Sequence, residues 1–260
     1  MKLLHFDYRM EITYSIPVDK CYYTIKCIPV NSDRQKLEKY DVYFEPDSQY
    51  SLGKDGFLNP YFYGSEEKPH GTFVFGIKGE VTVGMMEAES AKDDMKLAVF
   101  RHPYGLNTPG NQIKKYHDTF EFAEGQNAYD RVLTMMHQLY HDFVYQKQVT
   151  SMDTSAEEAF SMKKGVCQDY AHILISLCHL EAIPARYVAG MMLGEGASHA
   201  WVEVCIDGYW RGLDPTNDKV VDDDYIKLSH GRDATDCLIN RGVIVGGGRQ
   251  IQTVQVNVWE

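Results

Sequence analysis

The segment Gly165–Ala171 reads G-V-C-Q-D-Y-A and opens the clearest helical pattern of the chain. After Cys167, apolar residues recur at helical spacing as far as Cys178, and Pro184 lies beyond the expected end of the helix. Cys167 is therefore expected in the first turn of a buried helix, where free backbone N–H groups and the helix dipole favour a thiolate. The alternative, a small buried apolar cysteine, suits Cys178 better than Cys167.

A shorter helix is expected just upstream. Ser155 followed three residues later by Glu158 is a capping-box signal. It predicts a helix over about Ala156–Lys163, with Gly165 just past its end.

Two further blocks predict a β-hairpin. They read S-H-A-W-V-E-V at Ser198–Val204 and L-D-P-T-N at Leu213–Asn217. The strand-like residues His199–Ile206 are followed by Asp207-Gly208, a strong signal for a two-residue turn, and then by a return strand.

This hairpin brings an imidazole and a carboxylate to one face. With the two-residue turn, Trp201 pairs with Asp214, and His199 shares the face of Trp201. His199 and Asp214 are then diagonal neighbours, with Cα atoms about 7–8 Å apart. Singly, His199 could be a satisfied core histidine and Asp214 a turn carboxylate. Together with Cys167 they predict a nucleophile, a base and an orienting acid.

These three blocks resemble the signature blocks of the transglutaminase-like superfamily, whose core is papain-like. The resemblance implies that Cys167 is the nucleophile, that His199 is the general base and acid, and that Asp214 orients the imidazole. Each block surrounds the residue that the chemistry needs, and the three follow in the family's order.

More narrowly, the chain resembles the bacterial transglutaminase-like cysteine peptidases that carry an amino-terminal β domain. Three weaker stretches fit that group: D-G-F-L-N-P-Y at Asp55–Tyr61 with His70, G-R-D-A at Gly231–Ala234, and R-G-V-I-V-G-G-G at Arg241–Gly248. With them, the resemblance spans nearly the whole chain.

The amino-terminal part reads as β structure. Residues Leu4–Tyr14 alternate strictly between apolar and polar, which predicts a half-buried strand, and Cys21–Ile28 predicts a second. The β pattern continues through Val42–Phe44, Thr72–Lys78 and Glu80–Met85, and no helix signal precedes about residue 88. These residues predict an antiparallel β-sandwich or barrel.

The fold predicted for the whole chain is α+β, with two domains. His102–Asn111 contains two prolines and two glycines and is the best boundary candidate. We therefore expect an amino-terminal β domain at residues 1–108 and a papain-like, transglutaminase-like catalytic domain at 109–260, with helices packed on an antiparallel sheet.

Aromatic residues in the amino-terminal part could form a binding surface, but we expect them to fill the β core or cover its edges. They are Tyr22, Tyr23, Tyr61, Phe62 and Tyr63.

A metal site is not expected. Asn127 can cap a helix whose apolar stripe is Tyr129, Val132, Leu133, Met136, Tyr140 and Phe143. His137 and His141 on this helix have metal-ligand spacing, but Gln138 replaces the glutamate of H-E-x-x-H and no third ligand is evident. We expect no cofactor.

A thioester-forming enzyme also needs a donor for the developing oxyanion, beside the backbone N–H of Cys167. In transglutaminase-like enzymes an aromatic or amide side chain upstream of the cysteine often supplies it. Tyr145 is our candidate, with a packing role as the alternative, and Gln168 is a weaker one.

Composition limits the partners. The net charge of −11 and the pI near 5.4 argue against nucleic-acid and anionic-membrane partners. Residues Met1–Met10 show no apolar signal core, and the six cysteines include no C-x-x-C. We expect a cytoplasmic protein with reduced cysteines, and the sequence leaves the oligomeric state open.

Three functions remain in competition. The first is a cysteine hydrolase, a peptidase or amidase that cleaves a peptide or isopeptide-like amide through a thioester. The second is transglutaminase-type transfer of the same acyl group to an amine, which uses the same residues. The third is a non-catalytic binding module. The bacterial resemblance and the expected location favour hydrolysis.

Overall fold

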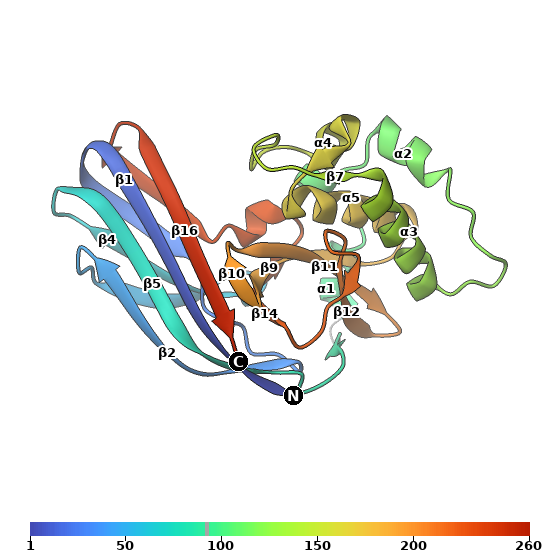
Figure 1. Cartoon of the computed structure of the whole chain (residues 1–260), viewed down its shortest axis with the longest axis horizontal. Helices are drawn as coiled ribbons and strands as arrows, with labels where there is room; N and C mark the ends of the chain where they lie inside the picture. The colour runs from blue at the N-terminus through green and yellow to red at the C-terminus, as the bar shows by residue number, and fades with distance from the viewer. Residues whose placement is uncertain (92–93) are drawn as a thin grey trace.

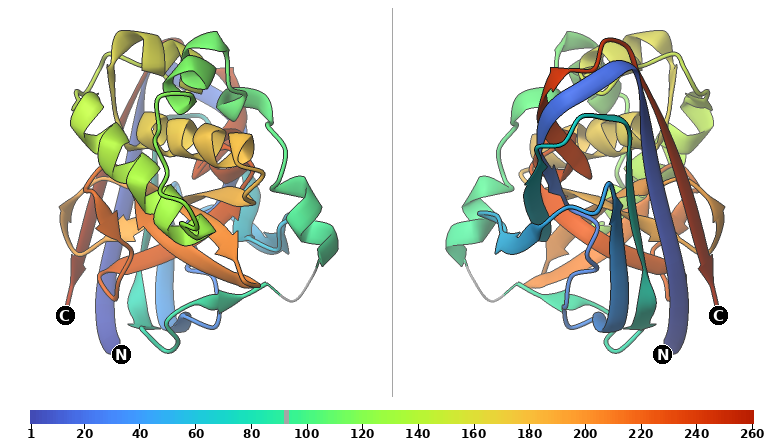
Figure 2. Two further views of the ribbon diagram at one scale, coloured as in Figure 1. Left: turned by 90° about the vertical axis from the view of Figure 1, so that its right-hand side faces the viewer. Right: turned by 90° about the vertical axis from the view of Figure 1, so that its left-hand side faces the viewer.

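The computed structural model describes residues 1–91 and 94–260. Its two main sheets are antiparallel, one with eight strands and the other with six (Figure 1). Helices α2 to α5 lie over the smaller sheet, and the larger sheet lies beside it, at the left of Figure 1; Figure 2 shows the same arrangement from both ends. The α+β class predicted from the sequence is confirmed.

The first sheet is organised around one long strand, β1 (Lys2–Ile25). The other seven strands are β2 (Gln35–Glu45), β3 (Tyr50–Lys54), β4 (Pro60–Glu66), β5 (His70–Val83), β10 (Gly194–Gly196), β15 (Asn240–Gly246) and β16 (Gln250–Trp259). The first half of β1 lies between β16 and β5, and its second half lies between β15 and β4. The sheet therefore curls, and it encloses an aromatic core that includes Phe44, Phe62 and Phe75.

The second sheet comprises β6 (Glu89–Ser90), β9 (Ala185–Met192), β11 (His199–Ile206), β12 (Tyr209–Asp214), β13 (Lys219–Val220) and β14 (Tyr225–Gly231). The helices are α1 (Asp94–Val99), α2 (Asn111–His117), α3 (Ala128–Asp142), α4 (Ala156–Met162) and α5 (Cys167–Leu180), with short 3₁₀ turns at Gly105–Asn107 and Ala234–Cys237. A parallel pair joins β7 (Val144–Tyr145) to β8 (Lys164–Gly165).

The central strands of the second sheet are buried on both faces. On one face, Ala189 and Val202 pack in the core formed with α5. On the other, Val188 packs with Trp201. Met191, two residues along β9 from Ala189, lies on the same face as Ala189 and packs in the core of the first sheet. These strands therefore hold α5 and the first sheet in fixed positions relative to each other.

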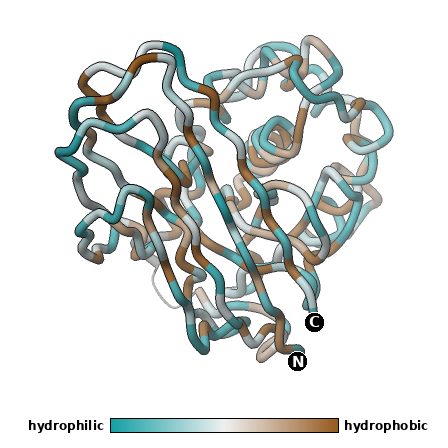
Figure 3. Tube along the Cα trace, turned by 60° about the vertical axis from the view of Figure 1, so that its left-hand side comes forward, coloured by the Kyte–Doolittle hydropathy of each residue, from teal (hydrophilic) through white to brown (hydrophobic). Residues whose placement is uncertain are grey.

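In two places, a pair of strands expected from the sequence is one continuous strand in the structure. The expected strands Leu4–Tyr14 and Cys21–Ile28 are both part of β1, because register shifts between Thr13 and Lys20 bend the strand without ending it. The expected break between Thr72–Lys78 and Glu80–Met85 lies inside β5. Figure 3 shows the alternation of polar and apolar residues along the strands of the first sheet.

Gly79 does not interrupt β5 because it serves close packing. A Cβ atom at Gly79 would lie 2.3 Å from the carbonyl oxygen of Lys39 on the neighbouring strand. The glycine therefore allows two backbones to approach, which is a common reason for glycine inside a strand.

The division of the chain between the sheets is not a single point. Residues 240–259 were expected in the carboxy-terminal domain, but β15 and β16 pair with β1 in the first sheet. Conversely, Glu89–Ser90 pairs with β12 of the second sheet. The division of the chain into two separately folding domains with a boundary near residue 108 stays a prediction.

Helix α2 was not expected. No side chain of its own segment caps it; instead the carboxylate of Glu157 accepts hydrogen bonds from the backbone N–H groups of Gln112 and Ile113. A cap supplied from 45 residues away leaves no local signal.

The expected aromatic core and helix stripe are correct in part. Tyr23 and Phe62 are buried, whereas Tyr22 and Tyr63 are 50% and 45% exposed.

Helix α3 begins after its predicted cap, Asn127, and buries Val132, Met135, Met136 and Leu139. Tyr140 was expected on the apolar stripe, but it is 41% exposed because Leu139 takes the inward position.

Candidate active site

The first turn of α5 carries Cys167, as predicted, and the cysteine is partly exposed. The carboxylate of Asp169 closes this turn by accepting a hydrogen bond from the backbone N–H of Val166 at 2.7 Å. Gly165 makes room for that carboxylate, because a Cβ atom there would lie 2.4 Å from Asp169 Oδ2. The left-handed residue that ends α4 is Lys163, with φ of 54°.

The predicted hairpin is present with the predicted register. Strand β11 begins at His199 and ends at Ile206, and Glu203 pairs with Gly212 of β12. Asp207 and Gly208 both have positive φ, 53° and 78°, as a type I′ turn requires.

His199 and Asp214 form a buried hydrogen bond. His199 Nε2 lies 2.7 Å from Asp214 Oδ2, and Asp214 is fully buried. Burial alone would lower the pKa of His199, but hydrogen bonds with Asp214 and Cys167 outweigh it and raise the pKa to about 10. Because Nε2 is committed to Asp214, Nδ1 is the ring nitrogen left for Cys167. The structure thus brings the three predicted residues together.

Two residues that the sequence analysis missed hold the carboxylate of Asp214. Tyr225 Oη donates to Asp214 Oδ2 at 2.9 Å, and Asn217 Nδ2 donates to the same oxygen at 2.7 Å. Burial would raise the pKa of Asp214, but these bonds and the one to His199 lower it. Asn217 lies in the quoted L-D-P-T-N block, whereas no local pattern connects Tyr225 with it.

Trp201 supports both His199 and Tyr225. Its ring contacts the Tyr225 ring edge-on, with centroids 5.4 Å apart, and lies 6.4 Å from the His199 ring. Gly190 on β9 leaves the space for it, since a Cβ atom there would lie 2.3 Å from the indole. The imidazole therefore rests on a rigid aromatic layer.

The two oxyanion candidates differ in position. Tyr145 pairs with Gly165 in the β7–β8 ladder, and the residue is 47% exposed. Burial first, and then the proximity of Cys167, raise the pKa of Tyr145, so its phenol stays a hydrogen-bond donor at neutral pH. Gln168 lines the same cavity as Cys167, but its amide donates to the carbonyl of Met152 at 3.2 Å.

Cys167 and His199 line a cavity of about 300 Å³ whose walls come from both sheets. Tyr187 belongs to the second sheet, while Gln252 and Val254 belong to β16 of the first. Among the described residues that line the cavity, none is Asp, Glu, Lys or Arg. A substrate bound there meets an uncharged surface around the thiol and the imidazole.

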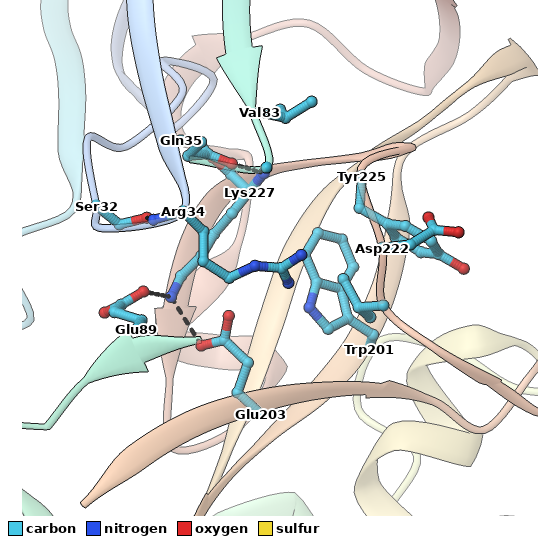
Figure 4. Close-up of a pocket in the computed structure, with 12 residues that line it drawn as sticks. Ser32, Arg34, Gln35, Val83, Glu89, Trp201, Glu203, Asp222, Tyr225 and Lys227 are labelled. Carbon is cyan, nitrogen blue, oxygen red and sulfur yellow. Dashed lines mark hydrogen bonds and ion pairs between the residues drawn. The ribbon is translucent and has the colours of Figure 1, made fainter. Parts of the chain in front are cut away.

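A second cavity, of about 20 Å³, adjoins Trp201 and Tyr225 (Figure 4). Beside it, Lys227 Nζ lies 2.7 Å from Glu203 and 3.1 Å from Glu89, and Arg186 lies 3.0 Å from Glu89. Although burial would raise the pKa of Glu89, Lys227 and Arg186 lower it to about 2. This ion cluster ties together β6, β9, β11 and β14.

The first sheet is connected to this cluster through Gln35 of β2. Its side-chain amide donates to the carbonyl of Lys227 at 2.9 Å and accepts from the N–H of Lys227 at 2.8 Å. The buried glutamine therefore pairs with β14 as a neighbouring strand would.

One of the two histidines with metal-ligand spacing pairs with a carboxylate. His137 Nδ1 contacts the carboxylate of Asp218. Within residues 1–91 and 94–260, no group of three or more His, Cys, Asp or Glu side chains is placed to hold a metal ion. No helix in the described part of the chain has the length and apolar character needed to span a membrane.

Comparison with known proteins agrees with the fold and the motifs. The family described as the transglutaminase-like superfamily matches residues 119–215, and the bacterial transglutaminase-like N-terminal region matches residues 4–82. The chain therefore carries a transglutaminase-like core at residues 119–215, preceded at residues 4–82 by a region that matches the N-terminal region of bacterial transglutaminase-like proteins.

Curated relatives and one solved structure extend over most of the chain. An uncharacterised protein of Mycobacterium tuberculosis is 27% identical over 91% of this chain and 86% of its own length. An uncharacterised protein of Mycobacterium leprae is 35% identical over 42% of each chain. A protein from Cytophaga hutchinsonii, described as a candidate cysteine protease, has the same fold, with a TM-score of 0.81, 21% identity and coverage of 100% of this chain and 91% of its own.

Proposed function

We propose that this protein is a cysteine hydrolase that cleaves a peptide or isopeptide-like amide with Cys167, His199 and Asp214. The observation that carries the proposal is one arrangement: a thiol at a helix N-terminus lines a cavity with an imidazole that is hydrogen-bonded to a buried carboxylate. That arrangement supplies a nucleophile, a proton carrier and an orienting group within one uncharged cavity.

In the proposed first step, the Cys167 thiolate attacks the amide carbonyl carbon and a tetrahedral oxyanion forms. The imidazolium of His199 gives its proton to the amine as the C–N bond breaks, which leaves a thioester on Cys167 and a neutral imidazole. The raised pKa of His199 supports this step, because it keeps the proton on the ring until the amine takes it.

In the second step, His199 takes a proton from water, the hydroxide attacks the thioester carbonyl, and the C–S bond breaks to release the acid. Asp214 keeps its charge throughout and fixes the ring through Nε2. The backbone N–H of Cys167 and the phenol of Tyr145 are the proposed donors to the oxyanion.

The proposed nucleophile must remain a free thiol, so we infer that the enzyme works in a reducing compartment, and we propose the cytoplasm. The six cysteines are free in the structure. The bacterial N-terminal region and this location favour water over an amine as the acceptor.

The first experiment measures labelling of Cys167 by limiting iodoacetamide, by intact mass and peptide mapping, across pH. We expect Cys167 to react selectively well below pH 8 and His199→Ala to slow it at least tenfold. His141→Ala, which removes an exposed histidine of α3, is the matched control and should label as the unmodified protein does. Slow labelling shared among the six cysteines and indifferent to His199 would refute the proposal and favour a binding module.

A second experiment separates hydrolysis from transfer. A peptide-amide library is incubated with and without a primary amine, and the products are identified by mass. Release of the free acid in both conditions supports the hydrolase, whereas acyl transfer that predominates at low amine concentration would assign the protein as a transglutaminase. Cys167→Ala is the control and should form neither product.

A further inference from the structure

The cavity around Cys167 is bordered by an edge of β16 that no strand covers in the described part of the chain. Strand β10 pairs with β16 only through residues 256–258, opposite Gly194–Gly196. Residues 250–255 pair with β1 on one side alone. Two members of this open segment, Gln252 and Val254, line the cavity together with Cys167 and His199.

The hydrogen-bond alternation determines which backbone groups face the open edge. The N–H of Ser15 donates to the carbonyl of Arg249, and the same register continues without a shift along β1 and β16. Residues 251, 253 and 255 therefore bond to β1, and the N–H and C=O groups of residues 250, 252 and 254 point away from it. The next outward residues, 256 and 258, are those opposite β10.

The open segment lacks the features by which proteins usually protect an edge. It reads Gln-Ile-Gln-Thr-Val-Gln, with no charge and no proline. Edge strands normally carry lysine, proline or a bulge that discourages pairing with another chain. An unprotected edge beside an uncharged cavity that holds a thiol and an imidazole is suited to an extended polypeptide.

We propose that the substrate is a polypeptide in an extended conformation, and that it binds as an added strand on the open edge of β16, in line with β10. Its backbone pairs with the outward groups of residues 250, 252 and 254, and this pairing presents the amide to Cys167. The uncharged lining of the cavity selects neutral side chains next to that amide. This inference rests on the proposed function and assigns to the first sheet a part in substrate binding.

The test follows amide hydrogen exchange by NMR in three labelled forms of the protein, all with the natural sequence. One form is labelled with iodoacetamide; the other two carry a pool of neutral hexapeptides (Ala, Val, Thr, Gln) attached through an N-terminal chloroacetyl or a C-terminal vinyl sulfone group. In at least one peptide form, we expect exchange at Gln252 and Val254 to slow at least tenfold relative to the iodoacetamide form. Ile251 and Thr253, already bonded to β1, should change less than twofold.

Unchanged exchange at Gln252 and Val254 in both peptide forms would overturn the proposal, as would protection that is confined to β15. Failure of both peptide pools to label Cys167 faster than the same reactive groups without a peptide would overturn it as well. In each case, selective labelling by iodoacetamide that depends on His199 would leave the proposed hydrolase intact.

A second measurement needs no NMR. In peptide pools that are N-methylated at one backbone position at a time, methylation should slow labelling of Cys167 at alternate positions and not at the intervening ones, because only alternate amides of a strand face its neighbour. Slowing at every position, or at none, would contradict pairing with β16.

Discussion

The substitution Asp214→Asn tests how much the buried pair contributes, because it changes charge with little change in shape. Oδ2 of Asp214 receives hydrogen bonds from His199, Tyr225 and Asn217. An asparagine can place either its oxygen or its NH₂ group there. The oxygen keeps the acceptor but loses the charge, and the NH₂ group would face three donors.

The expected loss of unfolding free energy is about 3 kcal/mol. Breaking a buried ion pair by altering one partner typically costs roughly 3–5 kcal/mol. The lower end applies, because the asparagine oxygen can still accept one of the three bonds. Asp218→Asn is the matched control: its partner His137 is 53% exposed at the side chain, so we expect a loss of at most about 1 kcal/mol.

The loss should depend on pH in a defined direction. The pKa of His199 rises from its ordinary 6.5 to about 10 in the folded protein, so its contribution is complete below pH 6.5 and is lost as the pH rises towards 10. The pKa of Asp214 is lowered from 3.8, so its contribution is present above that pH and is lost in stronger acid. The difference between Asp214→Asn and the unmodified protein should therefore be largest between about pH 4 and 6.5.

Urea unfolding at pH 6 and pH 9.5, followed by circular dichroism, measures this difference. We expect the gap between the two proteins to shrink by at least half from pH 6 to pH 9.5. A gap that is the same at both pH values, or no larger than that of Asp218→Asn, would show that the His199–Asp214 pair does not stabilise the fold in the way described.

Three further substitutions have outcomes that urea unfolding can measure. Tyr225→Phe removes one hydrogen bond to a buried carboxylate and should cost about 1.5–3 kcal/mol, with selective thiol labelling retained but slower; an unchanged stability would contradict the bond. Glu203→Gln leaves Arg186 and Lys227 with a single carboxylate, Glu89, and should cost roughly 3–5 kcal/mol; a neutral effect would mean that the cluster is not a stabilising unit. Ser155→Ala removes the N-cap of α4 and should cost about 1 kcal/mol, whereas Ser155→Thr should restore most of it.

The candidate site could be predicted from sequence because local signals place it. The capping box at Ser155, the helical spacing after Cys167 and the Asp207-Gly208 turn each depend on neighbours in the chain. A two-residue turn also fixes the register of its hairpin, which is why the expected relation of His199 to Asp214 matches the hydrogen bond.

The structural features that the sequence analysis did not predict depend on contacts between residues far apart in the chain. Tyr225 reaches Asp214 because β14 lies beside β9, and strand order is not encoded locally. Helix α2 is capped by Glu157 from another helix. The bend in β1 keeps one continuous strand where the sequence predicts two, Leu4–Tyr14 and Cys21–Ile28.

The largest difference between the predicted and the observed fold concerns the carboxy-terminal residues. It bears on what the amino-terminal region does. The three proposed catalytic residues lie within 47 positions of one another. Part of the cavity that Cys167 and His199 line is nevertheless walled by β16, which pairs with β1 at the other end of the chain. A region that only recruited a partner could be joined by a flexible linker and need not contribute to this cavity. Here the curled sheet packs directly on β9 and β14, and it places beside Cys167 a strand edge that no described strand covers. The arrangement therefore favours a region that shapes the cavity around Cys167 over one that acts as an independent docking module.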